Sequence, residues 1–271
     1  MNAYVIQYNA KLQRIVRMVK RDIDAHVLPV IKQQASEYTL DAIATTDGWL
    51  DSINSVLDML KAKWSGVLMA QLASRIAGDF VQVAVKKSER DLKKSAGLDV
   101  FSQSPGLSEY LRASADQNAS LIESIPAQYL DQVSTLVVGN MRAGMRPGFI
   151  AKALQQQFGV TERRAKFIAR DQAGKIQGDL NERQQKSVGI EYFRWLDSDD
   201  SRVRHKHEEI ANKVTAFGVG VYSWSSLPLS EKGEPIKPGQ DYNCRCTAIP
   251  VSEQQVKRNQ DAGNVAPGVY R

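Results

Sequence analysis

The stretch TERRAKFIARDQAGKIQGDLNERQQKSVGIEYFRW, residues 161–195, decides the fold because the pattern of the sequence changes within it. Before Gly189, residues that would share one face of a helix recur every three or four positions. They are Ala165, Ile168, Gln172, Ile176 and Leu180. We expect Thr161 to cap this helix at its start. After Gly189, the run Tyr192-Phe193-Arg194-Trp195 alternates with the period of a strand. The sequence therefore predicts helices before this point and a mixed module after it.

The residues before this stretch follow the helical period almost throughout. One apolar stripe near the N-terminus comprises Val5, Leu12, Ile15, Val16, Val19 and Ile23. Because proline lacks the backbone donor, we expect Pro29 to kink or end that helix. Pro126 fits the first turn of a later helix, and Pro147-Gly148 and Phe158-Gly159 are expected to bracket a short one. This half is therefore predicted to be an extended helical body.

The residues after the aromatic strand are typical of a small α+β module. Residues 200–214 predict a short helix that ends at Asn212, a residue that tolerates the left-handed conformation. A loop rich in Gly, Ser and Pro follows, and residues 244–251 predict a strand. The fold class is therefore mainly α, with an extended N-terminal helical body (1–135), a C-terminal α+β module (136–251) and a flexible tail (252–271).

The net charge of +6 is concentrated in a limited region of the chain. Residues 141–190 contain ten Lys and Arg against four Asp and Glu, and the rest of the chain balances. Such a segment indicates a polyanionic neighbour, or else a solvated helix face whose counter-charges lie elsewhere in the fold. On the first interpretation, the candidate contacts to double-stranded DNA are Arg163, Arg164, Lys166, Arg170 and Lys175.

Composition excludes several classes of protein. The sequence has no run of about 18 apolar residues, so we expect no contact with a membrane interior. The N-terminal residues lack the apolar run and cleavage site of a secretory signal, which predicts a protein that stays where it is made. The two cysteines are separated by one residue, and a disulfide between them would be strained, so we expect both to be reduced.

Cys244, Cys246 and His207 are candidate metal ligands. Residues i and i+2 of a strand share one face, so the two thiolates with His207 can supply three zinc ligands, with an Asp or water as the fourth. Alternatively, both cysteines pack as small hydrophobic residues and His207 forms a hydrogen bond in the core. The second interpretation is favoured here because zinc sites more often use two cysteines separated by two residues. No other cofactor is indicated.

The run Asp200-Ser201-Arg202-Val203-Arg204 places guanidinium groups next to carboxylates. We interpret it as an ion-paired latch at the strand–helix junction rather than as a portion of an active site. His207 is a conceivable general base, but the sequence places no nucleophile beside it, so we predict no enzymatic activity. The aromatic strand can stack bases or bury Phe193 and Trp195 in a core, and the core interpretation is the simpler one.

At these residues the chain resembles the Mu F-like minor head proteins, also called phage head morphogenesis proteins. The resemblance is carried, in order, by IARDQAGKIQGDLNERQQKSVGIEYFRW (168–195), DSRVRHKHEEIANKV (200–214), YSW (222–224) and PGQDYNCRCTAIPV (238–251). The family motif residues fall on Asp200, Arg202, Arg204, His207, Cys244, Arg245 and Cys246. Asn212 stands where the family commonly has glycine, and the resemblance covers roughly residues 140–251.

The resemblance implies a minor structural protein of a tailed bacteriophage head, without enzymatic activity, that associates with the portal and the packaged DNA. It implies a place inside the capsid at the portal end, with assembly in the host cytoplasm. The portal protein and double-stranded phage DNA are then the expected partners, with the major capsid or scaffold protein as further candidates. The helical first half would be the docking arm. Two alternatives stay open: a toxin-like or hydrolytic effector that uses the Asp–Arg–His–Cys cluster, and a general DNA-binding module.

Overall fold

The computed structural model describes residues 3–37, 46–96 and 106–266, and it has the predicted fold class. The described helices are α1 (Ala3–Glu37), α2 (Thr46–Ser65), α3 (Val67–Ala96), α4 (Leu107–Arg142), α5 (Pro147–Ser187), α6 (His205–Asn212) and α7 (Glu253–Asp261). The strands are β1 (Tyr192–Leu196), β2 (Val214–Thr215), β3 (Gly218–Val219), β4 (Val221–Ser223) and β5 (Thr247–Val251). None of the helices in these ranges combines the length and apolar character needed to cross a membrane.

The chain divides into two compact units. Unit 1 comprises Met1–Asp79 and Ala115–Ala169, and unit 2 comprises Phe80–Ser114 and Arg170–Arg271. This grouping differs from a division near residue 135, because α3, α4 and α5 each continue from one unit into the other without a linker.

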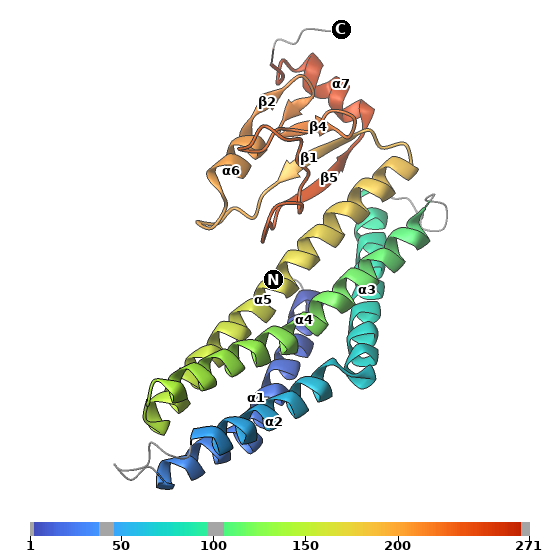
Figure 1. Cartoon of the computed structure of the whole chain (residues 1–271). Coiled ribbons are helices and arrows are strands. Elements are labelled where there is room, and N and C mark those ends of the chain that lie inside the picture. Colours follow the sequence, from blue (N-terminus) through green and yellow to red (C-terminus); the bar gives the residue numbers. More distant parts are fainter. Residues whose placement is uncertain (1–2, 38–45, 97–105, 267–271) are drawn as a thin grey trace. The chain divides into compact units, whose positions relative to one another are not determined.

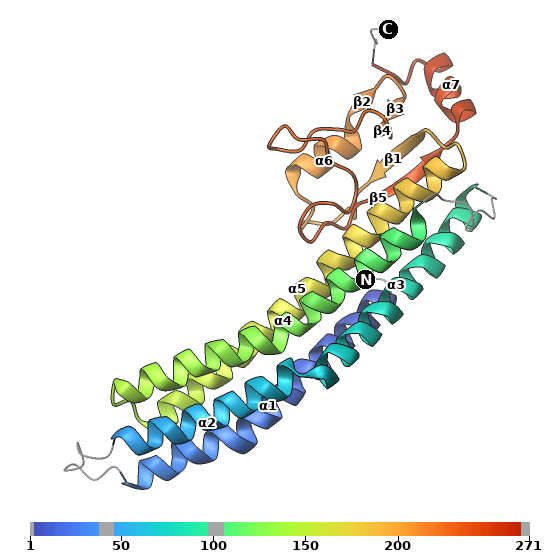
Figure 2. The same ribbon diagram turned by 45° about the vertical axis from the view of Figure 1, so that its right-hand side comes forward.

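Unit 1 is a bundle of long helices in which α1 lies beside α2 (Figures 1 and 2). The apolar stripe predicted near the N-terminus is confirmed, and each of its residues is at most 7% exposed. Polar contacts join α1 to the other helices of the unit. Tyr8 donates to Asn118 Oδ1 at 3.0 Å, and Gln13 donates to the Glu162 carbonyl at 2.8 Å.

The helix start predicted at Pro126 and the break predicted at Phe158-Gly159 are wrong, and of the two outcomes predicted for Pro29, a kink or an end, α1 excludes the end. Pro29 lies inside α1, and Pro126 lies inside α4. A proline within a helix costs about 3 kcal/mol, but the apolar stripe resumes beyond each one, with Ile31 and Tyr129 buried. Likewise α5 continues through Gly159, and the Thr161 hydroxyl donates to the Gln157 carbonyl at 3.1 Å instead of capping a new helix. Burial of the stripes outweighs the local helix-breaking residues.

The sheet of unit 2 has the strand order β4-β1-β5, and both pairings are antiparallel (Figure 1). Phe193 and Trp195 point to the same face of β1, and both are almost completely buried. They pack with Tyr222, Trp224, Ile210, Ile236 and Ala248. The core interpretation of the aromatic strand is therefore confirmed.

The C-terminal end of α5 is tied to this sheet by a buried glutamine. Gln185 donates to the Ala248 carbonyl of β5 at 3.1 Å and accepts the indole N–H of Trp224 at 3.1 Å. Residues of α3 and α4 that belong to unit 2 also contact α5: Ser88 donates to Gln184, and Tyr110 donates to Asp179 at 2.7 Å. These contacts join parts of α3, α4 and α5 into the helical portion of unit 2, and Gln185 of α5 joins it to the sheet.

Two predictions about backbone detail differ from the structure. The helix α6 does end at Asn212, but the following Lys213 is extended, and the Asn212 amide donates back to the Glu208 carbonyl at 3.0 Å. The non-glycine residues with positive φ, among those the structure describes, are Asp199 and Asn243. Residues 252–271, expected to form a flexible tail, contain α7, whose start is capped by Ser252 and whose Val256 is buried. Val256 packs with Val221 and Val251, and Asn259 donates to the Phe217 carbonyl at 2.9 Å, so apolar and polar contacts both hold this helix.

Candidate functional site

The loop at 238–246 is held close against two glycines of α5. A Cβ atom at Gly174 would lie 2.7 Å from the Cys244 carbonyl oxygen, and one at Gly178 would lie 2.3 Å from the Pro238 carbonyl oxygen. Real Cβ atoms do not approach backbone so closely, so only glycine permits this contact. The sequence analysis did not single out these glycines, although their spacing of four residues places both on one helix face.

A buried carboxylate of α5 holds the same loop. Asp171 is 4% exposed and accepts the backbone N–H of Asn243 at 3.1 Å. Its other oxygen lies 2.7 Å from the Lys175 ammonium, which itself lies 5.0 Å from the centre of the Tyr242 ring. Asn243 has a φ of 57°, a conformation that asparagine tolerates better than most residues. Lys175, a predicted DNA contact, is thus engaged inside the module.

The three predicted metal ligands come together at the end of this loop. The Nδ1 atom of His207 lies 3.6 Å from the Cys244 sulfur and 3.5 Å from the Cys246 sulfur. On its other side, Nε2 of His207 lies 3.4 Å from Asp241 Oδ2. The imidazole is 4% exposed and meets the edge of the Trp195 ring. α6 supplies the histidine, and the residues before β5 supply the thiols.

The two thiols have different proton affinities. Hydrogen bonding from Cys246 lowers the pKa of Cys244 to about 4, although burial opposes the shift. The same interaction and burial raise the pKa of Cys246 well above its ordinary value. The two cysteines therefore differ in the direction of their pKa shifts.

Asp200 pairs mainly with Arg245, which lies outside the run 200–204 from which an ion-paired latch was predicted. Both of its carboxylate oxygens accept hydrogen bonds from the Arg245 guanidinium, one at 2.6 Å. The Arg202 backbone N–H donates to Oδ1 at 2.9 Å, and the Arg202 side chain reaches Oδ2 at 3.3 Å. Arg245, followed by the Arg202 backbone, holds the pKa of Asp200 well below its usual range.

Arg204 holds the loop from the other end. Its guanidinium donates to the Tyr242 carbonyl at 2.6 Å and lies 3.5 Å from Asp241 Oδ2. The motif residues predicted from sequence, Asp200, Arg202, Arg204, His207 and Arg245, thus lie around one loop in unit 2. Asp241, which the sequence analysis did not choose, contacts both His207 and Arg204 and completes the set.

The comparison with known families bears on this loop and its neighbours. Residues 131–249 match the family described as Phage Mu protein F like protein. The chain carries a Mu F-like segment. This match confirms the resemblance that the motifs indicated.

A bacterial relative extends the similarity along most of the chain. An uncharacterized protein of Haemophilus influenzae is 28% identical over 261 residues, which cover 93% of this chain and 54% of the relative. The chain thus spans about half the length of that relative. No solved structure matches.

Within the Mu F-like segment, the five predicted DNA contacts have different surroundings. Arg163 and Lys166 are exposed on α5 and form no ion pair with the described residues. Arg164 donates to Ser124 at 2.9 Å, and partial burial lowers the pKa of its guanidinium. Arg170 is half-buried and belongs to unit 2, as does Lys175. The structure therefore leaves Arg163 and Lys166 as the exposed members of the set.

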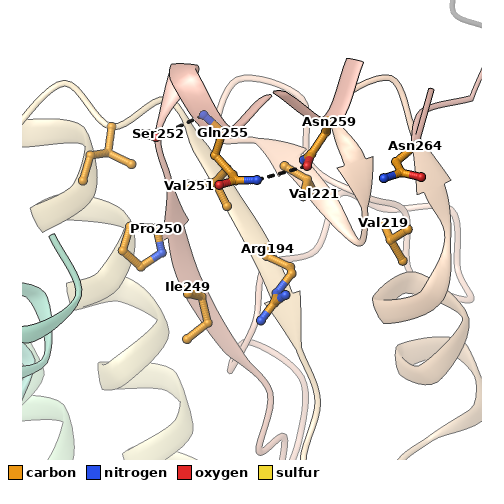
Figure 3. Close-up of a pocket in the computed structure, with 11 residues that line it drawn as sticks. Arg194, Val219, Val221, Ile249, Pro250, Val251, Ser252, Gln255, Asn259 and Asn264 are labelled. Carbon is orange, nitrogen blue, oxygen red and sulfur yellow. Dashed lines mark hydrogen bonds between the residues drawn. The ribbon is translucent and has the colours of Figure 1, made fainter. Parts of the chain in front are cut away.

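Two cavities border the sheet of the Mu F-like segment. The larger, of about 970 Å³, is lined by strand residues around the exposed Arg194 and by Gln255 and Asn259 of α7 (Figure 3). The second, of about 740 Å³, is lined by residues 194–197 and by Asp200 among others. Neither is lined by His207 or the cysteines, so these two cavities give no substrate access to the thiols.

Proposed function

We propose that this protein is a minor head protein of a tailed bacteriophage, located inside the capsid at the portal end and in contact with the packaged DNA, with no enzymatic activity. Its partners are the portal protein and double-stranded DNA, with the major capsid or scaffold protein as further candidates, and it assembles in the host cytoplasm. The observation that carries the proposal is the Mu F-like match, which includes all of the residues around the loop at 238–246.

The chemistry of that loop supports a structural role. Asp200 and Arg245 neutralise each other, and Arg204 is used to hold the Tyr242 carbonyl. An active site keeps charged groups available for a substrate, whereas these groups bind one another across the fold. The network is suited to keeping a small module rigid.

Contact with DNA is supported by the exposed cations Arg163 and Lys166 on α5. A guanidinium and an ammonium without an acidic partner bind phosphate at little cost of rearrangement. Lys152, on the same helix, is exposed as well. The acids of α5 that belong to unit 2 are already paired with lysines, so they do not compete for these residues.

The helical region 1–135 is proposed to dock on the portal or the capsid interior. Two large apolar side chains at the start of α3 support this, because Val67 is 73% exposed and Leu68 is 81% exposed. Two adjacent, strongly exposed apolar side chains are a place where a partner could bury apolar surface.

The test is quantitative mass spectrometry of purified, DNase-treated particles, with the portal subunit as internal standard. We expect the chain at or below the stoichiometry of the portal. The variant Val67→Ser/Leu68→Ser should enter particles at a clearly reduced level, whereas Ile6→Ser, which changes a 52% exposed residue of α1, should enter normally. Absence of the native chain from mature particles would contradict the proposal.

A hydrolytic effector is the second candidate, favoured by the contact of His207 with two thiols and Asp241. A cysteine hydrolase requires a thiolate that a small electrophile can reach. Rapid alkylation of Cys244 or Cys246 by iodoacetamide in metal-saturated native protein would support the effector, and slow alkylation of both thiols would support the head protein. A general DNA-binding module would bind DNA but would not co-sediment with the portal.

A further inference from the structure

Three side chains from two separate segments of unit 2 converge at the end of the loop at 238–246. The nitrogen and the two sulfurs of His207, Cys244 and Cys246 all lie within 4.8 Å of one another. The site combines one imidazole with two thiols, which is a common ligand set for zinc in proteins. From these residues we propose that the protein binds one Zn²⁺ ion through His207 Nδ1 and the Cys244 and Cys246 sulfurs.

The distances fit a tetrahedral ion. With zinc bonds of about 2.3 Å to sulfur and 2.0–2.1 Å to nitrogen, a sulfur and a nitrogen ligand lie about 3.6 Å apart across a tetrahedral angle. The structure places Nδ1 of His207 at 3.6 Å and 3.5 Å from the two sulfurs. The nitrogen therefore already lies at ligand spacing from both sulfurs, and the two sulfurs lie within 4.8 Å of each other.

The second nitrogen of the imidazole supports the same assignment. Histidines that bind metals usually give their other N–H to a carboxylate, which fixes the tautomer and the ring orientation. Nε2 of His207 lies 3.4 Å from Asp241 Oδ2, so the lone pair of Nδ1 is directed at the two sulfurs. Asp241 is thereby a positioning residue for the proposed site.

Trp195 offers a further polar group to the site. Its indole N–H is buried and forms no full hydrogen bond with a described residue. The Trp195 ring lies against the His207 ring, with 5.4 Å between the ring centres. A metal-bound thiolate is an acceptor for such an N–H, so the ion would give this buried donor a partner.

The proposed ion has a structural role, because its ligands are covered. His207 and Cys244 are each 4% exposed, and Cys246 is partly buried. The ion would join α6 to the residues that lead into β5, next to the contact of the loop with Gly174. A water molecule or a carboxylate completes the fourth position. The proposal concerns the stability of the module and does not depend on a role in the phage head.

The test uses the full chain purified without chelator. Metal analysis should find about one zinc per chain, and loading with Co²⁺ should give the intense visible bands of tetrahedral cobalt and a thiolate-to-metal charge-transfer band. Cys244→Ser and His207→Ala should lower the metal content by at least about tenfold. His205→Ala changes an exposed histidine of the same helix and should keep it.

A measurement on the native sequence keeps the test independent of variants that fail to fold. Both thiols should resist alkylation in zinc-loaded protein and become reactive after treatment with a chelator. Zinc far below one per chain after loading, together with no charge-transfer band with Co²⁺, would overturn the proposal. Thiols that react equally fast with and without chelator would overturn it as well.

Discussion

The two halves of helix α5 differ in what their charges do. In residues 170–187 each acid has a lysine partner: Asp171 with Lys175, Asp179 with Lys237, and Glu182 with Lys186 and Lys237. In residues 147–169 the exposed Arg163 and Lys166 have no such partner among the described residues. A count of charges along the sequence treats the two halves alike. The structure instead pairs the acids of residues 170–187 within a module and leaves Arg163 and Lys166 at the surface.

The largest effect should come from filling the space between α5 and the loop. Gly178→Ala would place a Cβ atom 2.3 Å from the Pro238 carbonyl oxygen, so the loop must move. We expect a loss of about 1–3 kcal/mol in the free energy of unfolding, as for other overpacked sites. Urea unfolding followed by tryptophan fluorescence measures it, since Trp195 and Trp224 lie in this module.

The matched control is Gly159→Ala in the other half of the same helix. There the new Cβ would meet only Arg163 Nη1, at an ordinary 3.6 Å. Alanine is favoured over glycine in a helix by up to about 1 kcal/mol, so this variant should be more stable than the native chain. Equal effects of the two substitutions would mean that the close contact with the loop is not maintained in solution.

The next effect concerns the buried carboxylate. Asp171→Ala leaves the Asn243 N–H without its acceptor and Lys175 without its partner. We expect a loss of about 1–3 kcal/mol. Asp131→Ala is the control, because its carboxylate is 68% exposed and pairs with Lys61 at the surface, where such a pair contributes about 0–1 kcal/mol. Similar losses in both variants, measured by urea unfolding, would contradict the distinction.

A smaller effect, dependent on pH, is expected at Asp200. Arg245 lowers its pKa in the folded state, so the carboxylate stabilises the fold above its unfolded pKa of about 3.9 and less as the pH falls below that value. The difference in stability between the native chain and Asp200→Asn should therefore be present at neutral pH and shrink in acid. Ser201→Ala, at a neighbouring exposed residue without a carboxylate, should show no such dependence. Urea unfolding at several pH values gives both curves.

The sequence predicted what depends on local periodicity. The stripe from Val5 to Ile23 and the buried Phe193 and Trp195 were correct because burial repeats with the period of each element. The continuation of α1 through Pro29 and of α5 through Gly159 was not predictable, since long-range packing outweighs a local preference.

The same limit applies to the candidate site. The residue types of the His–Cys cluster were visible in the sequence, but their distances depend on where the loop lies on Gly174 and Gly178. The ion pairs of Lys237 with Asp179 and Glu182 could not be predicted either, because these residues are not related by a spacing along one element. Contacts between segments that are distant in the sequence can be assigned only once the fold is known.

The smallest effect on stability is expected at the exposed cations Arg163 and Lys166. A change in DNA binding without a change in stability would distinguish their half of α5 from residues 170–187. Arg163→Ala/Lys166→Ala should change the free energy of unfolding by less than about 0.5 kcal/mol. The DNA affinity of the native chain should fall as the salt concentration rises, and a plot of the two logarithms gives a slope. If both residues contact phosphates, this slope should be less steep in the variant, by about 0.9 for each phosphate that is no longer neutralised. Fluorescence anisotropy with a labelled duplex at several salt concentrations measures this slope.

The control for that variant removes the same two positive charges elsewhere in unit 1. Lys11 and Lys61 are ion-paired with Asp79 and Asp131, at 2.7 Å and 2.9 Å, so Lys11→Ala/Lys61→Ala should leave the salt dependence close to that of the native chain. Equal changes in both variants would show that net charge alone governs DNA binding. An unchanged slope in the α5 variant would remove Arg163 and Lys166 from the DNA interface, because counterion release depends on the phosphates that are actually neutralised.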